Sequence, residues 1–338
     1  MQKKQSQKQK QPQNKKECFY DFVVNNAVKQ TEACFAISIN HSNKMVAVGC
    51  DESIKIYLFK QEQLKQISTL VGRQPHVRVL NFLKNSEILF SGSDDNCLTI
   101  WSMNSINNGK YVKKLHGHKG VINCLIINNE EDTIISGSDD RSIKFWRHKN
   151  QWVLNQTIIE HRDQVYGLSL NQLGNILISC GQDKQILVME IQQKGYQSQW
   201  VLKQKIKEQW SGYRLCFLSD NLFAFQFSAG KEMNFYEMND ENIFKKISSV
   251  AVKGNKEYCN HFFPQQIIQS KNLIVSKNGP YVNIIKIIKD NIFLYCSSIE
   301  FSPECLGNIY GQVTSDGEYL IIWDQKSSEI QIRKYMKS

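Results

Sequence analysis

A short unit that recurs along the chain constrains the fold more than any other feature of this sequence. Each unit holds three short apolar runs, and the residues that close the third run are separated by 44, 45, 43, 47, 49 and 48 positions. A repeat of this length buries its apolar faces only against neighbouring copies, so the chain is expected to form one array of units. The closing residues are Tyr57, Trp101, Trp146, Met189, Tyr236, Ile285 and Arg333.

The stretch 115–146 displays the unit most completely. A Gly-His pair is followed by the apolar run 121–127 and by the run that leads into Ser136-Gly137-Ser138-Asp139-Asp140, and a third run ends on a Trp. Val, Ile and Phe in short runs favour strands, and Gly and Asp favour the turn between them. Because the runs are apolar on both faces, each sheet is expected to be covered on both sides.

This pattern resembles the WD-repeat family, although Arg147 follows the Trp where the family usually has Asp. The resemblance implies an all-β, seven-bladed WD-repeat β-propeller, closest in units two to four. Units five to seven are predicted mainly from spacing, so six or eight blades are alternatives. The family further implies a hydrogen-bonded network in each blade that satisfies buried polar groups. Its predicted members are His118, Ser136, Asp140 and Trp146 in unit three, Ser91, Asp95 and Trp101 in unit two, and His161, Ser179 and Asp183 in unit four.

The N-terminus is predicted to differ in kind from the rest of the chain. Residues 1–16 hold six Lys and no acid, and without them the net charge of +10 falls to 36 basic against 32 acidic residues. Such a basic, Gln-rich tail cannot pack and is expected to be disordered. Residues 17–335 are the predicted propeller, closed by a strand over 18–24 that pairs with the last run and buries Phe19, Phe22 and Val24 or their neighbours.

No motif for catalysis, a cofactor or a metal stands out. The sequence lacks a nucleophile elbow and a phosphate loop, and the recurring Asp pairs favour structural turns over acid–base work. The ten Cys contain no Cys-x-x-Cys pair, which favours reduced, buried thiols, and His116 and His118 lack further ligands at metal spacing. We therefore expect a protein that is not an enzyme and that holds no cofactor and no metal.

The predicted function is a non-catalytic protein-interaction scaffold that docks partner proteins in a multiprotein complex. Two alternatives are a WD-repeat scaffold of cytosolic iron–sulfur cluster assembly, which unit one is similar to, and a nucleic-acid-associated propeller that uses the basic tail. The chain has no apolar run of roughly 18 residues and no signal peptide, so a cytoplasmic or nuclear location is expected. The candidate partner-binding residues, in loops entering first strands and in acidic turns, are Arg73, Arg78, Arg162, Tyr166, Asp94, Asp139 and Gln182.

Overall fold

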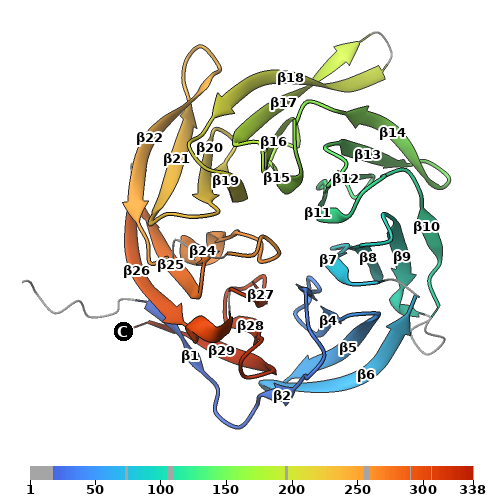
Figure 1. Cartoon of the computed structure of the whole chain (residues 1–338), viewed down its shortest axis with the longest axis vertical. Coiled ribbons are helices and arrows are strands. Elements are labelled where there is room, and N and C mark those ends of the chain that lie inside the picture. The colour runs from blue at the N-terminus through green and yellow to red at the C-terminus, as the bar shows by residue number, and fades with distance from the viewer. Residues whose placement is uncertain are drawn as a thin grey trace, which may run out of the picture.

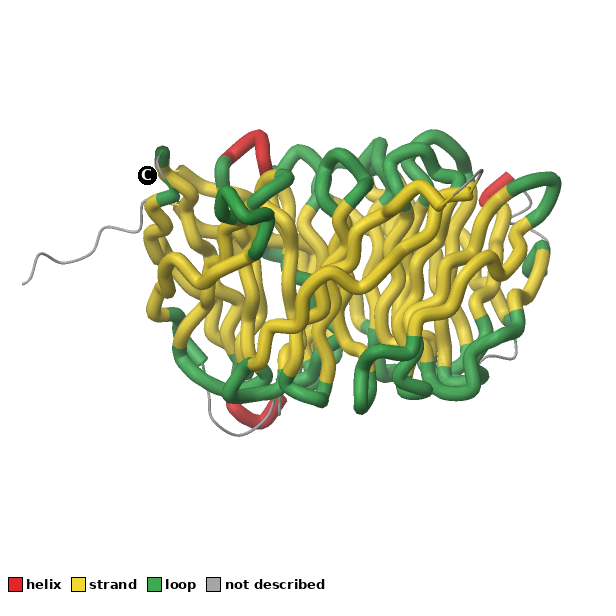
Figure 2. The backbone as a smooth tube through the Cα atoms, turned by 90° about the horizontal axis from the view of Figure 1, so that it is seen from above, coloured by secondary structure: helices red, strands yellow, loops and turns green. Residues whose placement is uncertain are grey.

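The computed structural model is a closed ring of seven small antiparallel sheets, in which chain order runs once around the ring (Figure 1). The structure describes residues 18–72, 75–104, 110–194, 197–254, 259–289, 291–305 and 307–337. The predicted disordered tail, residues 1–16, lies outside them. Seen from the side, the strands stand between two faces made of loops and turns (Figure 2). The prediction of an all-β, seven-bladed propeller is confirmed.

Each of the first four blades is a sheet of four strands that follow one another in the chain. Their bounds are β3 (Ala36–Ile39), β4 (Met45–Gly49), β5 (Ser53–Lys60) and β6 (Gln63–Val71) in blade 1; β7 (Val77–Phe82), β8 (Ile88–Ser93), β9 (Leu98–Ser102) and β10 (Lys113–Leu115) in blade 2; β11 (Ile122–Ile127), β12 (Thr133–Ser138), β13 (Ile143–His148) and β14 (Trp152–Ile158) in blade 3; and β15 (Val165–Leu170), β16 (Ile176–Gly181), β17 (Gln185–Lys194) and β18 (Gln197–Lys207) in blade 4.

The remaining strands form blades 5 to 7, and two 3₁₀ turns are the helical elements that accompany them. Their bounds are β19 (Gly212–Ser219), β20 (Leu222–Phe227), β21 (Glu232–Met238) and β22 (Phe244–Ala251) in blade 5; β23 (Gln266–Ile268), η2 (Gln269–Lys271), β24 (Leu273–Asn278), β25 (Tyr281–Ile288) and β26 (Ile292–Glu300) in blade 6; and η3 (Pro303–Cys305), β27 (Ile309–Val313), β28 (Tyr319–Asp324) and β29 (Glu329–Lys337) in blade 7, with β1 (Cys18–Phe22) and β2 (Val28–Lys29). Within the described residues, no helix has the length and apolar character needed to cross a membrane.

The apolar core lies between neighbouring blades, as the two-sided apolar runs predict. Gly137 shows how closely two blades approach. A Cβ atom at this position would lie 2.6 Å from the Cys124 sulfur of its own blade and 2.7 Å from a methyl carbon of Val165 in blade 4. These separations are well below van der Waals contact, so any larger residue here would push the two sheets apart.

The first strands of the blades line the axis of the ring, and their inner edges are bridged by side chains. The Ile39 amide donates to Gln312 Oε1 at 2.7 Å, and the Phe217 amide donates to Ser169 Oγ at 3.0 Å. The Asn81 side chain likewise donates to a backbone carbonyl of blade 3. An inner strand has no further strand beside it, so these bonds satisfy edge groups that would otherwise need water.

Blade 7 joins the two ends of the described chain. β1 pairs antiparallel with β29 in a register that sets Cys18 against Lys337 and Phe22 against Arg333, and the two strands lie side by side in blue and red (Figure 1). The Val23 amide extends this ladder by donating to Ile332 O at 2.9 Å. The sheet edge at β29 is thereby covered.

The buried side chains of this strand are neighbours of the three residues named in the prediction. Cys18 and Tyr20 are buried, whereas Phe19 and Phe22 are partly exposed and Val24 is 68% exposed. Successive side chains of a strand point to opposite faces, so Phe19 points away from the face that buries Cys18 and Tyr20, whereas Phe22 ends β1 and Val24 lies beyond it. The Tyr20 hydroxyl also donates to Gly317 O at 2.9 Å, which fixes the register from the buried side.

Candidate functional site

One hydrogen-bonded chain of four side chains spans blade 3. Trp146 Nε1 donates to Ser136 Oγ at 2.9 Å, and Ser136 Oγ lies 2.8 Å from His118 Nε2. His118 Nδ1 lies 2.9 Å from Asp140 Oδ2. A carboxylate can only accept, so His118 carries its proton on Nδ1 and accepts from Ser136 at Nε2. Each buried donor then has an acceptor, which describes a structural network.

Electrostatics support this assignment of protons. Burial would raise the pKa of the Asp140 carboxyl, but hydrogen bonds from His118, Ser142 and the Lys119 amide outweigh it and lower the pKa. Burial lowers the pKa of His118 and outweighs the opposing effect of Asp140. The pair is therefore a neutral imidazole held by a carboxylate at neutral pH. The Asp140 oxygens are occupied by the backbone amides of Lys119 and Ser142 as well.

Blade 4 repeats the arrangement without the indole. His161 Nδ1 lies 2.9 Å from Asp183 Oδ2, and His161 Nε2 lies 2.8 Å from Ser179 Oγ. Met189 occupies the place of the Trp, so the chain of bonds ends at the serine. Burial would raise the pKa of the Asp183 carboxyl, but His161 and the backbone amides of Arg162 and Gln185 together outweigh it and lower the pKa.

Blade 2 contains part of the network. Trp101 Nε1 donates to Ser91 Oγ at 2.9 Å. Asp95 accepts instead from the Cys97 amide at 3.0 Å and from Lys114 Nζ at 2.8 Å. Here the acidic turn is held by a lysine of the same blade.

The turns that carry these Asp residues and the loops that lead into each first strand lie on one face of the ring, which we call the turn face. On the turn face, the Arg78 guanidinium donates two hydrogen bonds to the Asp94 carboxylate, from Nε to Oδ1 at 2.6 Å and from Nη2 to Oδ2 at 2.8 Å. His76 Nδ1 lies 2.9 Å from the same carboxylate. The guanidinium also lies 4.7 Å from the centre of the Phe35 ring and 5.0 Å from that of Phe262. Arg78 is thus fixed in place at the rim of the axis.

The other candidate partner-binding residues differ in how far they are free to meet a partner. Asp139 accepts from Asn123 Nδ2 at 2.7 Å, and burial raises the pKa of its carboxyl. The Tyr166 ring stacks on His261 with 4.2 Å between centres. Arg162 and Gln182 are exposed, and Arg73 lies outside the described residues. Arg78 and Tyr166 were expected in the loops that enter first strands, but each is the second residue of its strand, in β7 and β15.

Sequence reasoning missed the segment 259–265, which crosses the axis of the ring and which we call the axial segment. It contacts blades 1 to 4 through Phe35, Arg78, Asn123 and Tyr166. It contacts blades 5 to 7 through further bonds: Arg214 Nε to Phe263 O at 2.7 Å, Ser276 Oγ to Gln265 Oε1 at 3.3 Å, and Asn260 Nδ2 to Tyr310 Oη at 2.8 Å. The seven blades therefore meet one short stretch of chain at the axis.

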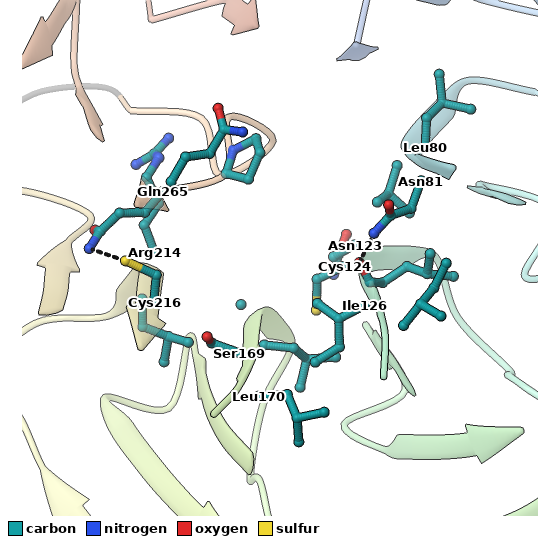
Figure 3. Close-up of a pocket in the computed structure, with 18 of the residues that line it drawn as sticks. Leu80, Asn81, Asn123, Cys124, Ile126, Ser169, Leu170, Arg214, Cys216 and Gln265 are labelled. Carbon is teal, nitrogen blue, oxygen red and sulfur yellow. Dashed lines mark hydrogen bonds between the residues drawn. The ribbon is translucent and has the colours of Figure 1, made fainter. Parts of the chain in front are cut away.

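Two cavities border the axial segment, and His261 and Phe262 line both of them. A cavity of about 410 Å³ is bordered by turn-face residues, including Asp139, Gln164 and Asn308. A cavity of about 380 Å³ lies along the inner strands, and its lining includes Lys84 and Glu131. Figure 3 shows Leu80, Ile126 and Leu170 around this second cavity, with Gln265 of the axial segment donating to the Cys216 sulfur at 3.2 Å.

A patch of exposed side chains stands on the turn face at blade 4, made of Arg162, Gln182, Lys184 and Trp210, and we call it the blade 4 patch. Trp210 is 54% exposed, and Lys184 Nζ lies 6.0 Å from its ring centre. The loops that carry the patch are tied together, because the Arg162 amide donates to Asp183 Oδ2 at 2.9 Å and Ser211 Oγ donates to Gln182 O at 3.1 Å. Large exposed aromatic side chains beside cations are common anchors of protein interfaces.

A comparison with known protein families now bears on this geometry. The family model described as WD domain, G-beta repeat, matches residues 64–102, 109–147 and 152–188. These stretches contain the Ser and Asp positions of blades 2 to 4 and the Trp positions of blades 2 and 3. The structure shows seven blades in a closed ring. The chain is a seven-bladed β-propeller that carries WD repeats in blades 2 to 4. WD-repeat propellers generally mediate protein–protein interactions and are typically non-catalytic scaffolds.

Relatives of this WD-repeat propeller match over part of their length. A protein named nuclear distribution protein PAC1 from Komagataella phaffii is 21% identical over 205 residues, covering 60% of this chain and 40% of the relative. The protein of the same name from Debaryomyces hansenii is 31% identical over 134 residues, covering 30% of this chain and 25% of the relative. The chain thus spans less than half the length of these relatives.

Within the described part of this WD-repeat propeller, no group of three or more His, Cys, Asp or Glu side chains is placed to hold a metal ion. Sequence reasoning also missed Trp210, Phe262 and His261. Trp210 was detectable, since a Trp beside Ser-Gly between two strand runs falls in a loop. The positions of Phe262 and His261 depend on the path of a loop, which carries no repeating pattern.

Proposed function

We propose that this WD-repeat propeller is a non-catalytic scaffold that docks partner proteins through its turn face in a multiprotein complex. The observation that carries the proposal is the blade 4 patch, where an exposed Trp and two exposed cations stand on loops that are hydrogen-bonded to each other. A rigid, pre-organised aromatic anchor loses little entropy on binding.

Residues at the rim of the axis also support docking on the turn face. Arg78 is held between two aromatic rings and a carboxylate, so it presents a fixed guanidinium edge beside the 410 Å³ cavity. A partner segment that reaches the axis would meet this edge together with the polar groups of Asn123 and Gln164. The blade 4 patch and the rim together form the proposed docking surface.

The proposed location is the cytoplasm or the nucleus. The two relatives carry the name nuclear distribution protein, which accords with a role inside the cell. The partner is proposed as a protein of such a complex, while nucleic acid is the alternative that the basic N-terminal residues suggest.

The test is affinity purification of the full chain from its own cells, with quantitative identification of the co-purifying proteins. Trp210→Ala and Arg162→Ala should each lower the recovery of a partner at least tenfold, since interface anchors typically contribute more than about 1.4 kcal/mol. Leu173→Ala is the matched control, because Leu173 is 70% exposed but lies on the opposite face, in the turn between β15 and β16.

Two outcomes would contradict the proposal. Equal recovery of every partner with both turn-face variants would remove the docking role of the blade 4 patch. Recovery of nucleic acid with a steep dependence on salt, unchanged by Trp210→Ala, would favour the nucleic-acid alternative.

A further inference from the structure

The sulfur of Cys259, the first described residue of the axial segment, contacts two buried cations. Arg214 Nη1 lies 3.2 Å from it, and Lys277 Nζ lies 3.7 Å from it. Arg214 is 1% exposed and Lys277 is 0% exposed. These cations come from β19 and β24, so two blades bring their charges to one thiol.

The two cations have no carboxylate as a counter-charge among the described ion pairs. Their other bonds go to neutral carbonyls, from Arg214 Nε to Phe263 O at 2.7 Å and from Lys277 Nζ to Asn260 O at 3.2 Å. A buried cation is stable when a negative charge is close to it. The deprotonated sulfur of Cys259 is the group in contact that can supply one.

The two positive charges favour the thiolate form of Cys259 and so lower its pKa. Burial would raise the pKa of Cys259, but Arg214 and then Lys277 outweigh burial and lower the pKa to about 7. Burial lowers the pKa of Lys277 to about 8, against the opposing effect of the Cys259 charge. By contrast, burial raises the pKa of Cys216 to about 12.

The thiol is also within reach of small reagents. Cys259 is partly exposed and borders the 410 Å³ cavity on the turn face. Reactive cysteines combine access of this kind with a positive environment, whereas buried structural cysteines lack both. Cys34, Cys50 and Cys180, for example, are 0% exposed.

We propose that Cys259 is a redox-reactive site, which hydroperoxides oxidise to a sulfenic acid in the cation pair of Arg214 and Lys277. The thiolate sulfur attacks one peroxide oxygen, an S–O bond forms, and the O–O bond breaks. The sulfur loses two electrons, and the distal oxygen gains them and departs as alkoxide, or as hydroxide when the oxidant is hydrogen peroxide. It then takes up a proton to become an alcohol or water. Lys277, with its Nζ 3.7 Å from the sulfur, is the donor of that proton, because the guanidinium of Arg214 does not give up its own.

The size of the effect follows from the fraction of thiolate. At pH 7 a thiol whose pKa is about 7 is half ionised, whereas a thiol at the ordinary value of 9.0 is roughly 1% ionised. The lower basicity reduces the intrinsic nucleophilicity about tenfold. Cys259 should therefore react about fivefold faster at pH 7 than an equally accessible ordinary thiol.

The experiment measures the pH dependence of alkylation of each cysteine by iodoacetamide on the full chain, with mass spectrometry to separate the sites. The rate at Cys259 should reach half its maximum near pH 7. Cys296 is the internal control, because it is also partly exposed and its thiol contacts the carbonyl of Leu294. After dilute hydrogen peroxide, dimedone should label Cys259 several-fold more than Cys296, and Cys259→Ser should remove that label.

Two variants separate the cation from the fold. Lys277→Met should move the half-maximum at Cys259 to higher pH, and Lys277→Arg should largely restore it, while a thermal melt reports whether each variant is folded. If Lys277→Met does not fold, the pH dependence of alkylation at Cys259 and Cys296 in the wild-type chain tests the proposal. A half-maximum at Cys259 as high as that at Cys296, or dimedone labelling no greater than at Cys296, would overturn the proposal.

Discussion

His118 Nδ1 lies 2.9 Å from Asp140 Oδ2, and the side chain of His118 is fully buried. The same 2.9 Å separates His161 Nδ1 from Asp183 Oδ2 one blade further on. Since the two pairs stand at the same place in neighbouring blades, they belong to the architecture of the ring. Both carboxylates also bind the backbone amide of the residue after the histidine, so each pair closes a loop onto a turn.

Replacement of Asp140 should destabilise the propeller without affecting a chemical step. Asp140→Ala leaves the buried His118 Nδ1–H and the Lys119 and Ser142 amides without their acceptor, at a cost of roughly 1–3 kcal/mol in unfolding free energy. Asp132→Ala is the control, because the Asp132 side chain is 42% exposed in the same blade and should cost about 0.5 kcal/mol or less. Urea unfolding of the two variants measures the difference, and equal midpoints would rule out the network role.

Removal of the closing strand should lower the melting temperature sharply. A chain that starts at Glu17 keeps β1, whereas a chain that starts at Asn25 loses the burial of Cys18 and Tyr20 and uncovers β29. Tyr20 alone should contribute on the order of 1.5–3 kcal/mol. The chain from Glu17 should melt like the full chain, and the chain from Asn25 should melt many degrees lower and tend to aggregate. If both melt alike, β1 does not close the ring.

Acid should weaken the axial segment through His261. Burial, together with the charges of Arg214, Arg78 and Lys277, holds the pKa of His261 well below its ordinary value of 6.5. Between these two values the unfolded chain binds a proton that the folded chain does not bind. The stabilisation is therefore present above about pH 6.5 and is lost as the pH falls, by at most about 1.4 kcal/mol per pH unit.

His261→Gln tests this dependence, because glutamine has no proton to gain. We expect the free energy of unfolding of His261→Gln to fall less steeply than that of the wild type between pH 6.5 and pH 5. Urea titrations at several pH values measure both slopes. Parallel slopes would show that His261 does not titrate on unfolding.

The axial segment is expected to contribute to stability, besides shaping the cavities. Phe263 is 0% exposed and packs in the core of blades 6 and 7. Phe263→Ala should cost about 3–5 kcal/mol, as do other large-to-small substitutions in a core. Leu173→Ala, at a side chain that is 70% exposed, should stay within about 0.5 kcal/mol. Thermal and urea unfolding of the two variants measure this difference. An unchanged unfolding free energy for Phe263→Ala would mean that the axial segment does not stabilise the ring.

Repetition explains which parts of the fold could be predicted from the sequence. Ser136 and Trp146 stand at fixed distances from the turn at Asp140, and the same distances recur around Ser91 and Trp101. Two residues that are hydrogen-bonded within one blade can therefore be recognised in the sequence by the fixed number of residues between them. The seven units could be counted because each must present two apolar faces to its neighbours.

Features set by single, non-repeating contacts could not be predicted in the same way. The face of β1 depends on a register with β29 more than 300 residues away, and a shift of one residue exchanges Tyr20 for Phe19. The stacking of His261 on Tyr166 depends on a loop that turns inward between blades 5 and 6. Neither contact has a counterpart elsewhere in the chain that would reveal it as a pattern.

The pairing of β1 with β29 also determines how the ring responds to tension. Cys18 and Lys337 face each other in this antiparallel ladder, so a force applied between these two residues pulls the strands apart from one end. The backbone hydrogen bonds are then loaded one after another instead of together, as in a zipper. In a single-molecule pulling experiment with handles at these positions, β1 should detach first and at low force, while the six blades behind it remain folded. The contact that closes the ring in solution is therefore its weakest point under a mechanical load.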